Sequence, residues 1–359
     1  MTSLRRDGPG VSALLDTIET QRAGCEMAGS PLYADLLDAV ATDVVKGGVC
    51  ARLLAPFAEA PFGDAVLLRF LAAVHLLVLD GSDPELAAHY PSTGGAHGPA
   101  VGLAFVAAVA RHEARLADLL HVGVQTNEVG RSVALLGGFL EVARVGLPLR
   151  ILELGASAGL NLGFDRYRYE AGAESFGPID ARVRFVDPWI GRVPDLGANL
   201  RVASRQGCDL HPIDPTTEAG RLRLRAYVWP DQPQRRARLD AAIASAQDLP
   251  VTIDRAEAAT WLSERLAEPA PDRVTVVVHS IMLQYLSAAA RRALLAVLES
   301  HGAATDRRAP LAWLRMEPGG DRAETRLTLW PTGATEVLST GAFHGPPVAW
   351  LADRHLASQ

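Results

Sequence analysis

Cysteine is scarce in this sequence. The 359 residues include three, Cys25, Cys50 and Cys208, which are odd in number and far apart. Neither a disulfide framework nor a Cys-x-x-Cys metal site is therefore predicted, and ordinary reduced thiols are expected. The histidines show no His-x-x-x-His or His-Glu-x-x-His spacing, so no metal site is expected from them either.

Positive charge is not in excess. Lys and Arg number 35 against 41 Asp and Glu, which gives a formal net charge of −6 and a pI near 5.9. Non-specific attraction to a polyanion needs clustered Lys and Arg, so no nucleic-acid partner is expected. A small-molecule or carrier-bound substrate fits this composition better.

Long hydrophobic runs are also missing. The longest apolar stretch, residues 65–79, is interrupted by Arg69 and His75. It is shorter than the roughly 20 residues that a membrane-spanning helix requires. Residues 1–10 contain two arginines, but no apolar run or small-residue cleavage site follows them, so no signal peptide is predicted. We expect a cytoplasmic protein with no membrane partner.

What the sequence does contain is typical of a globular protein. Hydrophobic residues make up 48% and charged residues 21%, and the length fits about two domains. Residues 1–147 show helical periodicity, which predicts an all-helical domain that covers the substrate, and the Gly- and Pro-containing stretch 90–99 predicts a loop within it. Three helices are expected to bury one face each, formed by Leu32, Leu36, Leu37 and Val40; by Leu67, Leu71, Val74 and Val78; and by Leu103, Val106, Val109 and Ala110.

From residue 148 to 359, short apolar runs alternate with amphipathic segments. This alternation predicts an α/β fold with a doubly wound, Rossmann-like and mostly parallel sheet. A short link between the last two runs predicts a terminal hairpin and hence one antiparallel edge strand. Two alternating runs predict an inserted hairpin at about 166–198. The candidate strands are 150–154, 201–205, 250–253, 274–278, 311–316, 326–330 and 336–339, and the candidate helices are 234–247, 256–266 and 288–301.

Residues 150–161 join a buried strand to a predicted helix through small residues, in the order Arg-Ile-Leu-Glu-Leu-Gly-Ala-Ser-Ala-Gly-Leu-Asn. Such a turn lets the backbone approach a ligand closely, and a helix N-terminus favours a carboxylate. The acid at the strand end can accept from an ammonium group. The segment therefore predicts a site for S-adenosylmethionine (SAM); a glycine-rich turn without a ligand is the alternative. The expected cofactor contacts are Glu153, Gly155, Ala156, Ser157, Gly159 and Asn161.

Two further strand ends are expected to complete the cofactor site. Asp209, followed by Leu210, ends the second strand and is placed to accept hydrogen bonds from both ribose hydroxyls. Asp254 and Arg255 end the third strand, where the carboxylate would meet the adenine amino group. The alternatives are a turn cap for Asp209 and a helix N-cap for Asp254. The inserted hairpin accounts for the long spacing between Glu153 and Asp209.

Five blocks of the sequence carry a resemblance to a known family. They are 124–132 (VQTNEVGRS), 153–162 (ELGASAGLNL), 165–169 (DRYRY), 207–214 (GCDLHPID) and 228–235 (VWPDQPQR). Together they resemble the bacterial domain of unknown function 2332 family over nearly the whole chain. The resemblance implies a class I methyltransferase-like fold with an N-terminal helical part, and it implies no substrate. Cys208 and His211 replace the Ile and Asn common in the family, and Asp209 is unchanged.

The polar run 125–131 lies just before the predicted Rossmann-like domain. Asn127 and Glu128 are predicted to be catalytic residues that face the amino acid end of the cofactor or the substrate. Arg131 can pair with a carboxylate in bidentate fashion. The alternative for this run is a helix cap or a cluster of hydrogen bonds between domains.

Two more catalytic candidates follow the fourth strand. His279 is predicted to contact the cofactor and to act as a general base, because an imidazole titrates near neutral pH; the alternative is a structural histidine. Tyr285 is predicted to line the site or to present its ring to the sulfonium of SAM, and ordinary packing is its alternative.

Three functions fit these features. The leading hypothesis is a SAM-dependent methyltransferase acting on a small molecule or carrier-bound metabolite, as in secondary metabolism. The second is a SAM-consuming cyclase, in which the α-carbon or amine of SAM attacks its own γ-carbon to give aminocyclopropane- or azetidine-carboxylate and methylthioadenosine. The third is a non-catalytic SAM-binding protein. The oligomeric state is left open, with a homodimer as one option.

Overall fold

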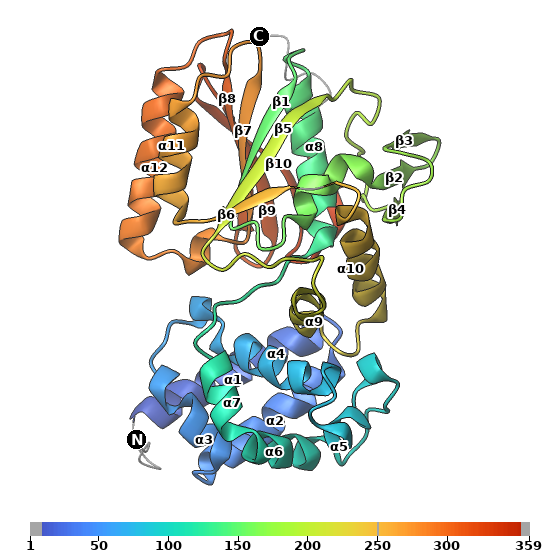
Figure 1. Cartoon of the computed structure of the whole chain (residues 1–359), viewed down its shortest axis with the longest axis vertical. Coiled ribbons are helices and arrows are strands. Elements are labelled where there is room, and N and C mark those ends of the chain that lie inside the picture. The colour runs from blue at the N-terminus through green and yellow to red at the C-terminus, as the bar shows by residue number, and fades with distance from the viewer. Residues whose placement is uncertain (1–8, 250, 353–359) are drawn as a thin grey trace. The chain divides into compact units, whose positions relative to one another are not determined.

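A computed structural model describes residues 9–249 and 251–352. By its internal contacts the chain divides into two compact units. The helical unit comprises Met1–Thr126 and Thr217–Ala237, and the α/β unit comprises Asn127–Thr216 and Arg238–Gln359 (Figure 1). The α/β unit thus begins before the expected boundary at 147. Residues 217–237 group with the helical unit, although they lie in the range predicted for the Rossmann-like domain.

The helical unit packs its helices around one apolar core. The expected faces of α2 and α4 are buried. The face predicted for α6 is partly wrong. Val109 is buried and Val106 packs against the core as expected, but Leu103 is 81% exposed, and Val101 and Phe105 are buried instead. The helices are α1 (Pro9–Met27), α2 (Pro31–Val45), α3 (Val49–Leu54), α4 (Val66–Leu79), α5 (Pro84–Ala87), α6 (Val101–Arg111), α7 (Glu113–Leu119) and α9 (Glu218–Ala226), with the short 3₁₀ turns η1 (Ala55–Phe57), η2 (Phe62–Asp64) and η3 (Pro91–Thr93).

The segment Thr217–Ala237 is held in the helical unit by polar and aromatic contacts. Asp231 accepts hydrogen bonds from the Ser30 hydroxyl at 2.7 Å and from the backbone N–H of Leu32 at 3.0 Å. The ring of Trp229 lies 5.7 Å from that of Tyr33, and both side chains are buried. These contacts explain why the segment packs here although it follows strands of the other unit. The next helix, α10 (Pro233–Ala246), crosses the boundary between the units.

One segment of the described residues, Phe62–Leu79, has the length and apolar composition of a membrane-spanning helix. It comprises η2 and α4, and 61% of it is buried. A core helix of a globular domain passes the same test, so this segment is weak evidence for a membrane span.

The α/β unit contains an eight-stranded sheet with the order β11-β10-β9-β8-β7-β1-β5-β6 (Figure 1). Each of the seven candidate strands overlaps one of these strands, and Pro250, at the start of one candidate, lies outside the described residues. The strand that the sequence did not indicate is β11, which begins Gly-Pro-Pro. The strands are β1 (Leu149–Leu154), β5 (Val202–Asp209), β6 (Thr252–Arg255), β7 (Val274–Ser280), β8 (Leu311–Pro318), β9 (Ala323–Leu329), β10 (Ala334–Ala342) and β11 (Gly345–Trp350).

The sheet is mixed, with a parallel part and an antiparallel part. Strands β6, β5, β1, β7 and β8 are parallel neighbours, whereas β8, β9, β10 and β11 form an antiparallel meander. The prediction of one antiparallel edge strand is therefore wrong, because the three strands after β8 each pair antiparallel with the strand before them. The links 319–322, 330–333 and 343–344 are too short for a crossover helix, so each strand returns antiparallel to the one before.

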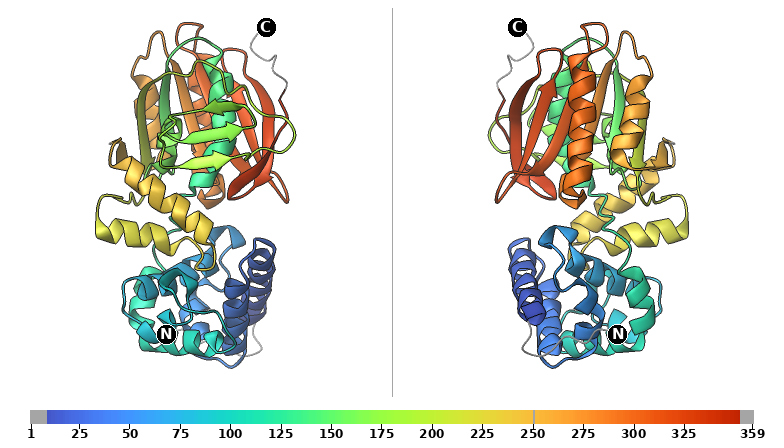
Figure 2. Two further views of the ribbon diagram at one scale, coloured as in Figure 1. Left: turned by 90° about the vertical axis from the view of Figure 1, so that its right-hand side faces the viewer. Right: turned by 90° about the vertical axis from the view of Figure 1, so that its left-hand side faces the viewer.

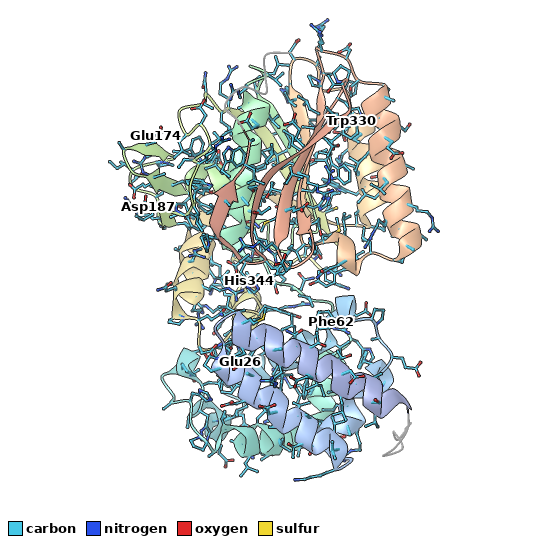
Figure 3. The ribbon with its side chains drawn as sticks, turned by 180° about the vertical axis from the view of Figure 1, so that it is seen from behind. Glu26, Phe62, Glu174, Asp187, Trp330 and His344 are labelled. Atoms are coloured by element: carbon cyan, nitrogen blue, oxygen red, sulfur yellow. The ribbon has the colours of Figure 1, made fainter. Side chains whose placement is uncertain are left out.

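Helices cover both faces of the large sheet. On one face lie α11 (Ala258–Ala267) and α12 (Ala288–Ala303), which pack on Leu152, Leu154 and Val277. On the other face lies α8 (Ser132–Ala143), whose twelve residues are all buried (Figure 2). Trp330, after β9, packs against Gly302 of α12 (Figure 3).

The insert after β1 forms a small sheet of three strands, β2 (Arg168–Ala171), β3 (Glu174–Phe176) and β4 (Arg184–Val186), in the order β3-β2-β4 (Figure 2). The predicted hairpin is partly wrong. The two runs taken for its strands contain β2 and β4, and these strands pair parallel, while the hairpin partner of β2 is β3. Glu174 and Asp187 both lie on this small sheet (Figure 3).

His75 of α4 makes the stability of the helical unit depend on pH. The ring is 1% exposed and contacts the carbonyl of Ala226 and the hydroxyl of Ser92. Burial lowers its pKa from 6.5 to about 3. The unfolded chain therefore takes up a proton below pH 6.5 that the native protein does not, so stability is full above pH 6.5 and falls towards pH 3, by roughly 1.4 kcal/mol per pH unit.

A His75→Gln variant tests this dependence by urea unfolding between pH 7.5 and 4. The variant should be less stable than the wild type at pH 7.5, because buried hydrogen bonds are lost, by about 1–3 kcal/mol. Its stability should then fall less steeply with acid. Parallel curves for the two proteins would show that His75 titrates normally in the native state.

Candidate functional site

The direction of strand addition reverses between β1 and β7. From β1 the parallel strands continue through β5 and β6 on one side and through β7 and β8 on the other. In open α/β sheets, ligands bind at the carboxyl ends of the strands next to such a reversal. Glu153, near the end of β1, pairs with Gly207 of β5 and with Val278 of β7. It is therefore the acidic residue at this point of the sheet.

The turn after β1 is tight and has the left-handed backbone conformation at three positions. Gly155, Ser157 and Gly159 have φ angles of 63°, 54° and 71°. The N–H of Ala156 donates to the carbonyl of Cys208 at 3.0 Å, and the N–H of Gly159 donates to the carbonyl of Ala156 at 2.7 Å. The left-handed conformation explains the glycines at both ends, because they adopt it without steric strain.

The helix expected to follow this turn is not an α-helix. The chain instead forms η5 (Leu160–Arg166), seven residues of 3₁₀ helix that lead into the small sheet. The prediction of a helix N-terminus that favours a carboxylate is therefore wrong, since so short a helix lacks the aligned peptide dipoles that the effect requires.

Protein side chains lie close to the two glycines. A Cβ atom on Gly155 would come within 2.6 Å of Cγ of Met282. A Cβ atom on Gly159 would come within 2.8 Å of Cδ1 of Ile253 and 2.9 Å of Cγ2 of Val251. Because the two glycines have no side chains, the neighbouring residues can pack against the backbone. This packing fits the alternative interpretation, in which the glycine-rich turn binds no ligand.

Asp209, at the end of β5, is joined to the turn after β1. Its Oδ2 accepts a hydrogen bond from the N–H of Ser157 at 2.9 Å, and its Oδ1 accepts one from the N–H of His211 at 2.8 Å. The carboxylate caps its own turn, as the alternative reading has it, and it also fixes the loop of the neighbouring strand.

The other residues predicted to hold the nucleoside lie beside Asp209. Leu210 is 58% exposed. Asp254 accepts a hydrogen bond from the indole N–H of Trp261 at 2.7 Å, so it anchors α11, and the N-cap of that helix is Glu257. Arg255 is exposed and donates to the carbonyl of Leu210 at 3.3 Å.

Asn127 and Glu128 organise the backbone around η4 (Val129–Arg131) and η5. The Asn127 side chain accepts a hydrogen bond from the N–H of Leu160 at 3.0 Å, and the Glu128 side chain caps η4 through the N–H of Gly130 at 2.9 Å. The amide of Asn161 donates to the carbonyl of Glu128 at 3.3 Å. These contacts match the alternative interpretation of residues 125–131 as a helix cap. They also connect these residues to the loop after β1.

Arg131 connects two other loops. It is 7% exposed, and its guanidinium donates to the carbonyl of Ser280 at 3.2 Å and to that of Phe343 at 3.0 Å. Ser280 ends β7, and Phe343 lies in the turn between β10 and β11, next to His344 (Figure 3). The sequence marked Arg131 as a candidate for a carboxylate, and no pattern indicated these carbonyl partners.

His279 is fully buried and both of its ring nitrogens are engaged. The indole N–H of Trp313 donates to Nε2 at 2.9 Å, and Nδ1 lies 2.7 Å from Oε1 of Glu317. An indole is only a donor, so Nε2 is the unprotonated nitrogen and Nδ1 carries the proton. The predicted role of general base does not fit this arrangement, which is that of a structural histidine. Tyr285, in η6 (Leu283–Tyr285), is 40% exposed.

Two buried acceptor atoms in the segment 153–161 have no hydrogen-bond donor. They are Oε2 of Glu153 and Oδ1 of Asn161, on side chains that are 3% and 4% exposed. Because the carbonyl of Glu128 can only accept, the orientation of the Asn161 amide is fixed, and its oxygen is the free end. Buried polar atoms nearly always have partners, so this pair indicates a place for an external donor.

The surroundings of Glu153 favour its neutral form. Burial raises the pKa of this carboxyl to about 8, and the charge of Asp209 adds to the rise, while Arg131 acts in the opposite direction. A carboxyl group that titrates so close to neutral pH is common in binding and catalytic sites. Among the described residues, no group of three His, Cys, Asp or Glu side chains could hold a metal ion.

Glu153 should therefore make the free protein less stable as the pH rises. The unfolded chain loses the Glu153 proton near pH 4.5, whereas the native protein retains it to about pH 8. Stability from this group is full below pH 4.5 and is lost as the pH rises towards 8, by roughly 1.4 kcal/mol per pH unit. Glu153→Gln should match the wild type in thermal unfolding at pH 5 and exceed it at pH 8.5. A constant difference between the two proteins across this range would contradict the assignment.

Comparison with known proteins places the chain in a family. No curated protein and no solved structure matches the sequence. Residues 16–350 match the family described as "Uncharacterized protein conserved in bacteria (DUF2332)". The match covers most of the sequence, including both units and every residue of the site described above. The chain therefore belongs to the DUF2332 family.

Proposed function

We propose that the α/β unit binds SAM at the carboxyl end of β1 and that the protein transfers the methyl group of SAM to a small-molecule or carrier-bound acceptor. The observation that carries this proposal is the pair of buried acceptors, Glu153 Oε2 and Asn161 Oδ1, which have no donor. SAM ends in an α-amino acid, whose ammonium group offers three N–H donors.

The fit of the ammonium group to these residues is chemical. An ammonium that donates to Glu153 and Asn161 would satisfy both acceptors, and its charge would favour the ionised form of Glu153. The structure holds both acceptors in place. Glu153 belongs to the central strand β1, and the Asn161 amide donates a hydrogen bond to the carbonyl of Glu128. A neutral ligand would add no charge that favours the ionised form, so Glu153 would stay protonated at neutral pH.

The nucleoside end would extend towards β5. Asp209, which fixes the Ser157 loop, would accept hydrogen bonds from the ribose hydroxyls there. The exposed side chain of Leu210 next to it offers an apolar surface for the adenine ring. Asp254 is engaged by Trp261, so a contact from this carboxylate to the adenine amino group is not part of the proposal.

The hydrogen bonds of His279 bear on which methyl acceptor we propose. SAM supplies the activated methyl group, and the protein has to align the acceptor with it and exclude water. His279 is not available to remove a proton, because Trp313 and Glu317 occupy its nitrogens. This favours an acceptor whose nucleophile needs no histidine base, such as an amine, a thiolate or a carboxylate. Tyr285, which is partly exposed, is retained as a residue that would contact the acceptor.

One observation favours the cyclase as a second candidate. Glu153 is buried and has a raised pKa, so it is a suitable base for the ammonium group bound beside it. Loss of a proton to Glu153 would leave an amine that attacks the γ-carbon, forming the N–Cγ bond, breaking the Cγ–S bond and releasing methylthioadenosine. The products are azetidine-carboxylate and the nucleoside. For either reaction we propose a cytoplasmic enzyme.

Isothermal titration of the purified protein with SAM tests the proposed site. Glu153→Gln should weaken binding about 10- to 100-fold, because a charge-assisted hydrogen bond worth about 1.5–3 kcal/mol is lost, and Asn161→Ala should weaken it about 5-fold. Glu141→Gln is the matched control. Glu141 is also buried and has a raised pKa, and it lies near the far end of α8 from Arg131. Equal effects of the Glu153 and Glu141 substitutions would place the site elsewhere.

Product analysis by mass spectrometry separates the reactions. S-adenosylhomocysteine that forms only when a cell extract is added supports methyl transfer. Methylthioadenosine that forms from SAM alone supports cyclisation. Binding without either product supports the non-catalytic alternative, and failure of the wild type to bind SAM removes the proposal.

A further inference from the structure

Arg131 is the buried cation at the carboxyl end of the sheet. It follows the capped segment at Asn127 and Glu128, and its guanidinium reaches two carbonyls that lie far apart in the sequence, those of Ser280 and Phe343. A guanidinium presents its donors in a rigid fork, which a lysine ammonium cannot reproduce. Arg131 thus ties the end of β7, the strand next to β1, to the β10–β11 turn.

Charged and titratable groups face Glu153 from three elements. Asp209 of β5 is negative and opposes ionisation of Glu153, and Arg131 of η4 is positive and favours it. Tyr167, which follows η5, is buried, and its hydroxyl donates to the carbonyl of Leu160, so it contributes no charge. Burial has the largest effect on the pKa of Glu153, and the anion and the cation shift this pKa in opposite directions.

We propose that Arg131 is a positioning residue for the SAM ammonium site: it orders the loops around the end of β1 and supplies the positive charge that allows Glu153 to ionise when the ligand binds. This inference rests on the proposed function. It assigns Arg131 a role through Glu153 and not a contact with the ligand.

A consequence of this proposal is that SAM binding releases a proton from Glu153. At pH 7 most Glu153 side chains in the free protein are neutral, because the pKa is about 8. An ammonium ligand selects the ionised form, so the proton of Glu153 passes to the buffer. The apparent affinity is reduced by the fraction of protein that is not ionised, and this fraction depends on Arg131.

Titration calorimetry with SAM in phosphate and in Tris, at pH 7 and pH 9, measures the proton. The wild type should release close to one proton per SAM at pH 7. At pH 9 Glu153 is already ionised and the α-amino group of SAM, which titrates at about pH 8, has to gain a proton, so net proton uptake is expected. Arg131→Gln should raise Kd about 10-fold at pH 7 and little at pH 9, as expected if the pKa of Glu153 rises by roughly one pH unit. Arg131→Lys, which keeps the charge, should retain the pH dependence of the wild type. An Arg131→Gln effect that is the same at both pH values would overturn the proposal.

A measurement on the free protein separates this inference from the proposed function. The pH dependence of thermal unfolding, compared with that of Glu153→Gln, gives the midpoint at which Glu153 titrates. Arg131→Gln should move this midpoint up by about one pH unit, and Asp209→Asn should move it down. Asp209 is only partly buried, so this second variant provides a test if Arg131→Gln does not fold.

The outcomes are distinct. If the midpoint moves as expected but the wild type does not bind SAM, the charge balance stands and the proposed ligand fails. If SAM binds and neither Arg131→Gln nor Asp209→Asn moves the midpoint, the role of Arg131 fails and the SAM site stands.

Discussion

The complete burial of α8 is the constraint on which the α/β unit depends. This helix lies between the large sheet and the insert, and none of its twelve residues is exposed. Gly137 and Gly138 make this possible, because a Cβ atom at either would come within 2.2 Å of Trp350 or Leu314 in the sheet. On the opposite side, Phe139 stacks on Phe164 of η5 with their ring centroids 4.0 Å apart. Close packing on two sides leaves α8 little freedom to shift.

The position of α8 in turn fixes the residues at its N-terminus. Arg131 immediately precedes the helix, and Asn127 and Glu128 lie one turn of chain earlier. Their hydrogen bonds reach the loop after β1, the end of β7 and the β10–β11 turn. Segments from four parts of the sequence therefore meet at one edge of the sheet because a buried helix starts there. The packing of the fold and the geometry of the candidate site have the same origin.

The sequence predicted the parts of this structure that depend on local pattern. Alternating apolar runs indicated seven strands of the large sheet, and Glu153 was recognised as an acid at a strand end. It did not predict β11, since Gly-Pro-Pro at its start is typical of a turn or an edge. Nor did it predict the partners of His279, because Trp313 and Glu317 are brought to it by strand pairing. The same holds for Arg131, whose carbonyl partners belong to distant loops and carry no side-chain signature.

Glu153 lowers the stability of the free protein at neutral pH. A buried carboxyl next to Asp209 opposes folding at neutral pH, and its Oε2 has no partner to compensate. A glutamine or an apolar residue at position 153 would avoid that penalty. The neighbouring residues of β1, Leu152 and Leu154, are apolar and belong to the hydrophobic core. Arg131 reduces the penalty without forming a hydrogen bond to the free oxygen. This carboxyl thus does not stabilise the fold, and the proposed cationic ligand would give it the partner that it lacks.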